Sequence, residues 1–207
     1  MQILNEIYSF LSKGGIMMIP LISSSIIALA IILERSFQLR QKKVLNPQVV
    51  RMLASIKEPK DIDATHVICN QNNSTFTNLI KVGLENRELP KEELRELLED
   101  QGRQESRVLE RGLGALETIA GAAPLMGLLG TVIGMIKVFN VISQIGVGQG
   151  SALSGGISEA LITTVVGLSI GIPVLIAYNY FIHKTENLIL DIEKYLMVLM
   201  KKINQVK

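Results

Sequence analysis

The sequence predicts an all-α integral membrane protein with three transmembrane helices, two of which extend into a cytoplasmic helical bundle. The main evidence is three long stretches that contain no Asp, Glu, Lys or Arg: residues 14–33, 118–136 and 160–182. A run of about 20 apolar residues is long enough to cross a bilayer as a helix. The composition agrees, because 48% of the 207 residues are hydrophobic and only 19% are charged.

The N-terminal region is expected to lie on the membrane before the chain enters it. Apolar residues recur at helical spacing between Ile3 and Leu11, which predicts an amphipathic helix in the outer interface over residues 1–13. Lys13 and two glycines then end this helix. The first transmembrane helix is predicted over residues 14–33.

Residues 34–117 are predicted to form a cytoplasmic helical loop. Asn46 followed by Pro47 is typical of a helix start, with proline at the first helical position. A long helix is expected from Lys91, and no proline interrupts it before the second span. Although glycines such as Gly112 weaken this run, we expect one continuous helix from the cytoplasm into the membrane.

The second half of the chain is predicted to cross the membrane twice. Residues 118–140 form the second span and residues 159–182 the third, joined by a short periplasmic connection at residues 141–158. In residues 183–207 the apolar residues recur at threes and fours. The third span is therefore expected to continue as a cytoplasmic C-terminal helix.

The distribution of positive charge predicts the orientation. Residues 34–117 contain 14 Lys and Arg and residues 183–207 contain five, whereas the other side has only Lys13 and Lys137. Cytoplasmic segments carry the excess of positive charge, so the N-terminus is expected in the periplasm and the C-terminus in the cytoplasm. Fourteen Asp and Glu balance the basic residues of the loop, which argues against a nucleic-acid-binding surface.

Spans two and three each carry a stripe of small residues that contains one threonine, Thr131 or Thr164. Small residues let helix backbones approach closely. Either the stripes serve packing alone, with each threonine bonding to its own helix, or they also line a polar path. The stripe residues are Ala123, Gly127, Gly130 and Gly134 in span two and Ala160, Gly167 and Gly171 in span three.

Glu159 is the one acid within reach of the membrane. It is either an ordinary glutamate of the first helical turn or a functional intramembrane acid. Glu159 and Thr164 lie about 140° apart around a helix, so they cannot share one face. If the stripe of Thr164 faces a central pore, Glu159 faces a neighbouring helix or subunit. Glu159 and Thr163 are then expected to face a neighbouring subunit or the rim, with a hydrogen bond between them, while Lys137 extends to the outer interface.

Other chemistry is not expected. His66 and Cys69 are three residues apart but have no companion pair, so they do not predict a metal site. The sequence contains no phosphate-binding loop and no nucleophile motif. We therefore expect neither an enzyme nor a bound cofactor.

Several segments resemble the MotA/TolQ/ExbB proton-channel family, with ExbB closest and TolQ second. They are residues 127–134, residues 156–168, the Ile172-Pro-Val174 stretch and the Tyr178-Asn179 pair. Leu33-Glu34-Arg35 at the end of the first span is also similar. The resemblance is most specific between residues 121 and 179.

The resemblance implies a ring-forming subunit of a proton-driven motor in the bacterial inner membrane. It implies a homopentamer and a single-span partner of the ExbD or TolR type, which brings a proton-carrying aspartate. The ring threonines, here Thr131 and Thr164, line the proton path, and Glu159 belongs to the same polar region. The stripe of Thr164 is therefore expected to face the partner helix. Since a threonine hydroxyl cannot hold a proton charge at neutral pH, the partner's acid is also a physical requirement.

The resemblance also implies the process that the motor drives. An ExbB-like subunit energises TonB-dependent transport across the outer membrane, and a TolQ-like subunit serves the Tol–Pal envelope-maintenance system. A MotA-type flagellar stator is disfavoured because only three spans are predicted. A non-conducting scaffold is a further alternative, and it predicts that Thr131→Ala and Thr164→Ala leave activity intact.

Overall fold

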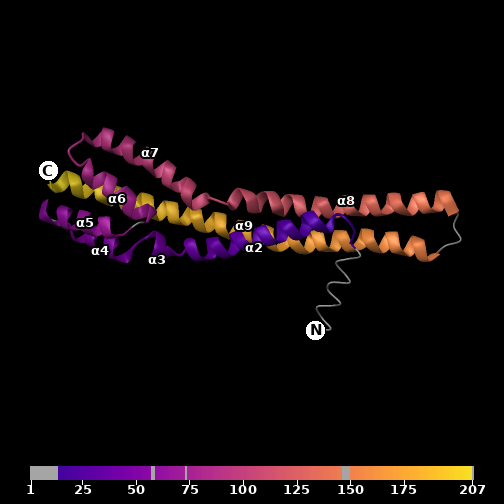
Figure 1. Cartoon of the computed structure of the whole chain (residues 1–207). Coiled ribbons are helices and arrows are strands. Elements are labelled where there is room, and N and C mark those ends of the chain that lie inside the picture. The colour runs from indigo at the N-terminus through magenta and orange to yellow at the C-terminus, as the bar shows by residue number, and fades with distance from the viewer. Residues whose placement is uncertain (1–13, 57–58, 73, 146–149, 207) are drawn as a thin grey trace, which may run out of the picture. The chain divides into compact units, whose positions relative to one another are not determined.

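Helices make up most of the described part of the chain, and short turns join them. The structure is a computed structural model that describes residues 14–56, 59–72, 74–145 and 150–206. No strand occurs among these residues, which confirms the all-α prediction. The expected amphipathic helix of residues 1–13 lies outside them. The helices, shown in Figure 1, are α2 (Met18–Gln38), α3 (Gln41–Val44), α4 (Pro47–Ser55), α5 (Pro59–Gln71), α6 (Thr75–Glu85), α7 (Lys91–Glu110), α8 (Leu113–Ile145) and α9 (Gly150–Val206).

Three of these helices are long and apolar enough to cross a membrane, which confirms the prediction of three spans. The candidate segments are Met18–Gln38, Leu113–Gln144 and Ser154–Gln205. The helix α9 continues without a break for 57 residues, as expected for a third span that extends beyond the bilayer. Because α8 reaches Ile145 and α9 begins at Gly150, both helices extend into the residues expected to form the connection.

The chain divides into two compact units. The described residues of Met1–Leu33 and Gly112–Asn179 form one, which we call the membrane unit. Those of Glu34–Arg111 and Tyr180–Lys207 form the other, which we call the extramembrane unit. The helices α2 and α9 pass from one unit into the other.

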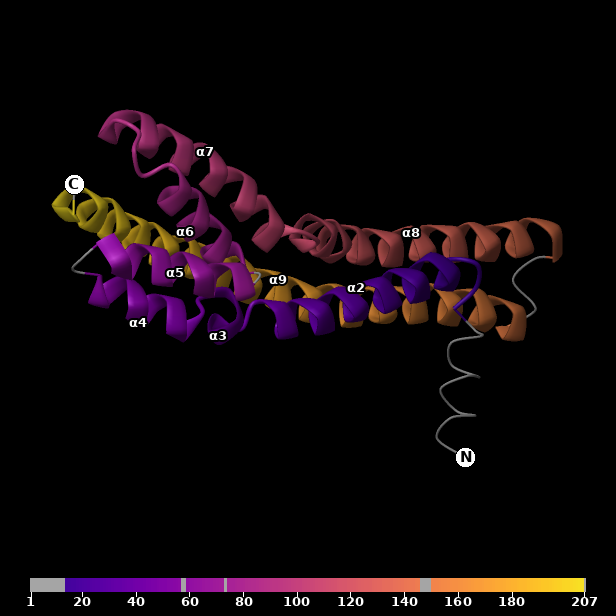
Figure 2. The same cartoon turned by 60° about the vertical axis from the view of Figure 1, so that its left-hand side comes forward.

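The membrane unit contains the first part of α2 beside α8 and α9 (Figures 1 and 2). Met18 and Leu21 of α2 are buried together with Ala123 of α8. The helices α8 and α9 approach most closely where Gly127 faces Gly167: a Cβ atom added to Gly167 would lie 2.6 Å from the carbonyl oxygen of Ala123. Such contact leaves no room for a larger side chain at this crossing.

The extramembrane unit packs short helices around the C-terminal part of α9. The ring of Phe76 in α6 lies 5.6 Å from the ring of Tyr195 in α9. The Lys202 ammonium group donates a hydrogen bond of 2.9 Å to the carbonyl oxygen of Ile56, at the end of α4. The predicted start of α4 is confirmed, because the Asn46 side chain accepts a hydrogen bond from the backbone N–H of Gln48.

The prediction of one continuous helix from Lys91 into the second span is wrong. The helix α7 ends at Glu110 and α8 begins at Leu113. Gly112 between them has a φ of 80°, a left-handed conformation that glycine adopts without steric cost and that commonly ends a helix. The buried Arg35 guanidinium lies 3.4 Å and 3.5 Å from the carbonyl oxygens of the last turn of α7. It thereby provides donors for carbonyls that have no partner within the helix.

Candidate functional site

A pair of threonine hydroxyl groups joins α8 to α9 within the membrane unit. Thr131 Oγ1 of α8 and Thr164 Oγ1 of α9 form a hydrogen bond with each other. Both side chains are only partly buried. They come from stretches of each helix that contain no charged residue. The structure therefore brings together the two threonines of the small-residue stripes.

The hydroxyl pair also contacts backbone carbonyls of both helices. The Thr164 hydroxyl lies 3.2 Å from the carbonyl oxygen of Gly127, and the Thr131 hydroxyl lies 3.2 Å from that of Ala160 and 3.4 Å from that of Gly127. Each hydroxyl group has one proton. One threonine therefore donates to the other, which in turn donates to a carbonyl. The direction of this short chain can reverse without any change in charge.

The small residues around the threonines pack α8 against α9 of the same chain. Cβ atoms added to Gly127, Gly134, Gly167 or Gly171 would meet atoms of the opposing helix at 2.6–2.9 Å. Ala123 and Ala160 are buried at 0% and 2% exposure. The expectation that the whole stripe of Thr164 faces a partner helix was therefore wrong for its small residues. The reason is that their lack of side-chain volume is used within the chain, between its own two spans.

Glu159 of α9 pairs with Lys137 of α8. The ammonium nitrogen of Lys137 lies 2.5 Å from Oε1 of Glu159, and the two side chains are 51% and 18% exposed. The expected extension of Lys137 to the outer interface did not include this pairing, which no pattern in the sequence indicated. Glu159 lies five residues before Thr164, about 7.5 Å along the helix axis. The ion pair thus stands about one and a half turns from the hydroxyl pair.

Gly15 also lies against the Glu159 carboxylate. A Cβ atom at Gly15 would collide with the Glu159 side chain. Gly15 also has a φ of 65°, a conformation that other residues adopt at a cost. The segment before α2 therefore closes over Glu159 only because a glycine stands at this position.

The second expected face of α9 is also corrected by the structure. Thr163 is 1% exposed, and it lies against Gly130 of α8. Its hydroxyl donates to the backbone carbonyls of Ala160 at 2.8 Å and Glu159 at 3.2 Å, not to the Glu159 carboxylate. Glu159 and Thr163 therefore contact other parts of their own chain. For Thr163 the expectation was wrong, because it placed residues around one helix without knowing how broadly α8 covers it.

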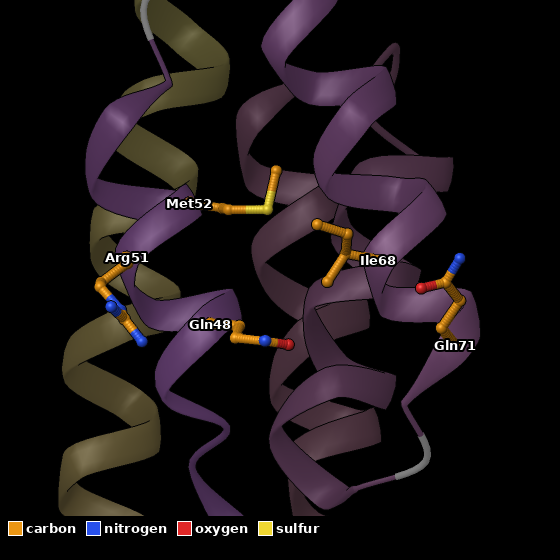
Figure 3. A pocket seen from close by; sticks show the side chains of 5 residues that line it. All are labelled: Gln48, Arg51, Met52, Ile68 and Gln71. Carbon is orange, nitrogen blue, oxygen red and sulfur yellow. The ribbon is translucent and has the colours of Figure 1, made fainter.

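A separate hollow lies between α4 and α5 of the extramembrane unit. It has a volume of about 510 Å³. Figure 3 shows Met52 and Ile68 approaching each other across it, whereas Arg51 points away from Ile68. The Arg51 Nε atom donates a hydrogen bond of 3.2 Å to the carbonyl oxygen of Pro47 in its own helix. This lining offers apolar surface without a convergent set of charged groups.

The described part of the chain contains no group of three or more His, Cys, Asp or Glu side chains that could hold a metal ion. Cys69 is buried in α5, and burial raises the pKa of its thiol to about 11. His66 lies 3.1 Å from the carboxylate of Glu85 rather than beside Cys69. The hydroxyl pair and the ion pair between α8 and α9 therefore remain the candidate functional site.

Comparison with known proteins gives a match over most of the chain. Residues 71–194 match the family described as the MotA/TolQ/ExbB proton channel family. The putative biopolymer transport protein ExbB-like 1 of Synechocystis is 33% identical over 174 residues, which cover 82% of this chain and 68% of that protein. ExbB-like 3 of the same organism is 32% identical over 187 residues, which cover 81% of each protein.

A shorter match extends to another branch of the same family. The Tol-Pal system protein TolQ of Pseudomonas aeruginosa is 39% identical over 85 residues, which cover 41% of this chain and 37% of that protein. Both kinds of relative thus share sequence with the chain, but the ExbB-like proteins share it over a greater length.

Proposed function

Since this chain belongs to the MotA/TolQ/ExbB proton channel family, we propose that it is the ring-forming subunit of an inner-membrane motor in which α8 and α9 form part of the proton path. The observation that carries this proposal is the hydrogen bond between the hydroxyl groups of Thr131 and Thr164. Two polar side chains meet here, in stretches of α8 and α9 that contain no charged residue. A purely structural helix pair needs only the small residues that surround them.

The hydroxyl pair is suited to relay or orient water but not to store a proton. A threonine hydroxyl both donates and accepts a hydrogen bond, yet it does not ionise near neutral pH. In the described residues of the spans, Glu159 is the nearest acid, and Lys137 already pairs with it. A titratable group must therefore come from another chain. A single-span partner of the ExbD or TolR type, with an aspartate at the depth of the threonines, fits this requirement.

The proposal includes an assembly and an orientation. Leu128, Val132 and Val165 remain 50–57% exposed on α8 and α9, and these apolar surfaces suit either lipid or further copies of the chain in a pentameric ring. The extramembrane unit and the end of α9 are placed in the cytoplasm, with the N-terminus in the periplasm. The excess of Lys and Arg in residues 34–117 and 183–207 supports this orientation.

We place the chain closer to ExbB than to TolQ. The ExbB-like relatives match more than 80% of the chain, whereas the TolQ relative matches 41%. An ExbB-like role means that proton flow energises TonB-dependent transport across the outer membrane. A TolQ-like role in envelope maintenance is the second candidate, supported by the 39% identity over that shorter match.

The proton path is tested by replacing both threonines with valine, which has nearly the same shape but no hydroxyl group. The double variant Thr131→Val, Thr164→Val is produced with a single-span partner in cells that lack their own motor subunits. We expect energy-dependent uptake to fall at least tenfold while the amount of protein in the membrane is unchanged. Restored TonB-dependent uptake by the unaltered chain supports the ExbB-like role, and restored envelope integrity without uptake supports the TolQ-like role.

Thr118→Val is the matched control because Thr118 lies in the same helix and donates only to Gly114 of its own helix, at 2.8 Å. Its exposed side chain has no contact with the hydroxyl pair. This variant is expected to retain full activity. Full activity of the double variant would overturn the proton-path proposal and favour the scaffold alternative.

A further inference from the structure

A polar hollow lies in the extramembrane unit where α9 leaves the apolar stretch of its membrane span. It has a volume of about 410 Å³, and its lining includes Gln41 of α3 and Tyr180, His183, Lys184 and Asp191 of α9. The uncharged run of α9 ends at Ile182. The hollow therefore begins at the level where a spanning helix meets the phospholipid headgroups.

Lys184 supplies the positive charge of this hollow. Its ammonium nitrogen lies 5.3 Å from the centre of the Tyr180 ring and 3.2 Å from the Tyr180 hydroxyl oxygen. An ammonium group has three N–H donors, and Tyr180 accepts from one of them. The tyrosine therefore holds the cation in place and leaves donors for an anion.

A second aromatic–cation pair stands at the end of the first membrane helix. The Arg40 guanidinium carbon lies 5.1 Å from the centre of the Phe37 ring. Lys42 and Lys43 follow in α3 and are exposed. No acid occurs between residues 35 and 57. Aromatic residues followed by basic residues are typical of helix ends at a membrane surface, and clustered basic residues there attract anionic lipids.

The acidic groups near the hollow already have partners. The Asp191 carboxylate accepts a hydrogen bond of 3.3 Å from the Gln41 amide, which also joins α3 to α9. It lies seven residues beyond Lys184, about 10 Å along the helix and away from the membrane span. Glu186 lies 3.1 Å from Nδ1 of His183. Lys184 thus stands at the membrane end of the hollow, and Asp191, the lining acid, stands at its far end together with Gln41 of α3.

We propose that this hollow binds the phosphate of an anionic phospholipid headgroup, with Lys184 as its principal ligand. The lipid fixes the level of the bilayer against α3 and α9. The site is separate from the proposed proton path, since its residues belong to the extramembrane unit and the threonine pair to the membrane unit. Proton flux and lipid binding can therefore fail independently.

The test is native mass spectrometry of the full chain purified in detergent and titrated with phosphatidylglycerol or phosphatidylcholine. We expect tighter binding of phosphatidylglycerol. Lys184→Gln is expected to weaken that binding about fivefold, since one lysine near an anionic surface contributes about 1 kcal/mol. Lys184→Arg is expected to retain binding. Elution of Lys184→Gln and Lys184→Arg as monodisperse proteins would show that both variants fold.

Lys194→Gln serves as the matched control because Lys194 is exposed on the same helix and does not line the hollow. Equal affinity of Lys184→Gln and Lys194→Gln for phosphatidylglycerol would overturn the proposal, as would equal binding of phosphatidylcholine. A third arm adds inorganic phosphate. Displacement of the lipid by millimolar phosphate would assign the hollow to a free anion and overturn the lipid assignment.

Discussion

Lys137 and Glu159 form an ion pair of 2.5 Å that joins α8 to α9 close to the threonine hydroxyl pair. Lys137 lies six residues beyond Thr131, and Glu159 lies five residues before Thr164. The two contacts therefore fix the two helices at neighbouring levels. Because Lys137 is half exposed whereas the Glu159 side chain is 18% exposed, the stabilising effect of the pair is expected to lie in the upper part of the range for surface pairs.

A double-mutant cycle with Lys137→Ala and Glu159→Ala measures this pairing. We expect a coupling free energy of about 1 kcal/mol, which is typical of a well-placed ion pair that water still reaches. The measurement is the stability of the purified chain in detergent, determined by reversible denaturation of all four proteins. A variant with only one partner left is expected to be less stable than the double variant if the remaining charge is poorly solvated.

Arg95 and Glu99 give a control for this cycle because they form an i, i+4 pair on the exposed surface of α7, at 2.8 Å. Such a pair is expected to couple more weakly, because water screens both charges. Equal coupling in the two cycles would show that the pair between α8 and α9 has no special structural role.

Gly15→Ala is predicted to destabilise the segment that covers Glu159. Alanine at a φ of 65° costs about 1–2 kcal/mol, and the added Cβ atom displaces the Glu159 carboxylate. We expect a lower apparent melting temperature in detergent, with part of the loss relieved when Glu159→Ala is also present. Gly121→Ala is the control, since a Cβ atom at Gly121 meets nothing within 4 Å. An equal effect of the two alanines would contradict this account.

The sequence predicted much of the membrane unit because the bilayer imposes strong patterns on it. Uncharged stretches located the three spans, and the two stripes of small residues singled out Thr131 and Thr164, which meet in the structure. The partner of Glu159 was not predictable, because an ion pair between α8 and α9 depends on how each helix is rotated about its axis. Helical spacing fixes angles within one helix but not the rotation of its neighbour.

The break between α7 and α8 shows a different limit. Gly112 weakened the predicted helix, but a single glycine in a helical pattern is often tolerated. The decisive contact comes from Arg35, more than 70 residues earlier, whose guanidinium reaches the carbonyl oxygens of Val108 and Leu109. Local sequence contains no information about such a distant partner.

Arg35→Met is therefore predicted to weaken the end of α7. Methionine resembles the unbranched apolar stem of arginine, but it lacks the N–H donors that reach Val108 and Leu109. We expect the free energy of unfolding to fall by about 1–3 kcal/mol. The loss is moderated because the substitution also removes the buried Nε atom of Arg35, which has no partner among the described residues. The measurement is denaturation of the purified chain. Arg95→Met on exposed α7 is the control, and an equal loss in both variants would contradict the capping role of Arg35.

The buried thiol of Cys69 predicts a loss of stability in alkali. Burial raises its pKa from 9.0 to about 11, an effect that Lys81 partly opposes. The folded chain therefore holds the thiol proton more tightly than the unfolded chain. The resulting contribution to the free energy of unfolding is complete below pH 9 and is lost as the pH rises toward 11. At pH 8 the folded thiolate fraction is about 100-fold lower than in the unfolded chain, so iodoacetamide should label the folded protein far more slowly. Cys69→Ala is expected to show a weaker pH dependence of unfolding between pH 9 and 11. Equal slopes for the variant and the unaltered chain would show that the thiol does not contribute.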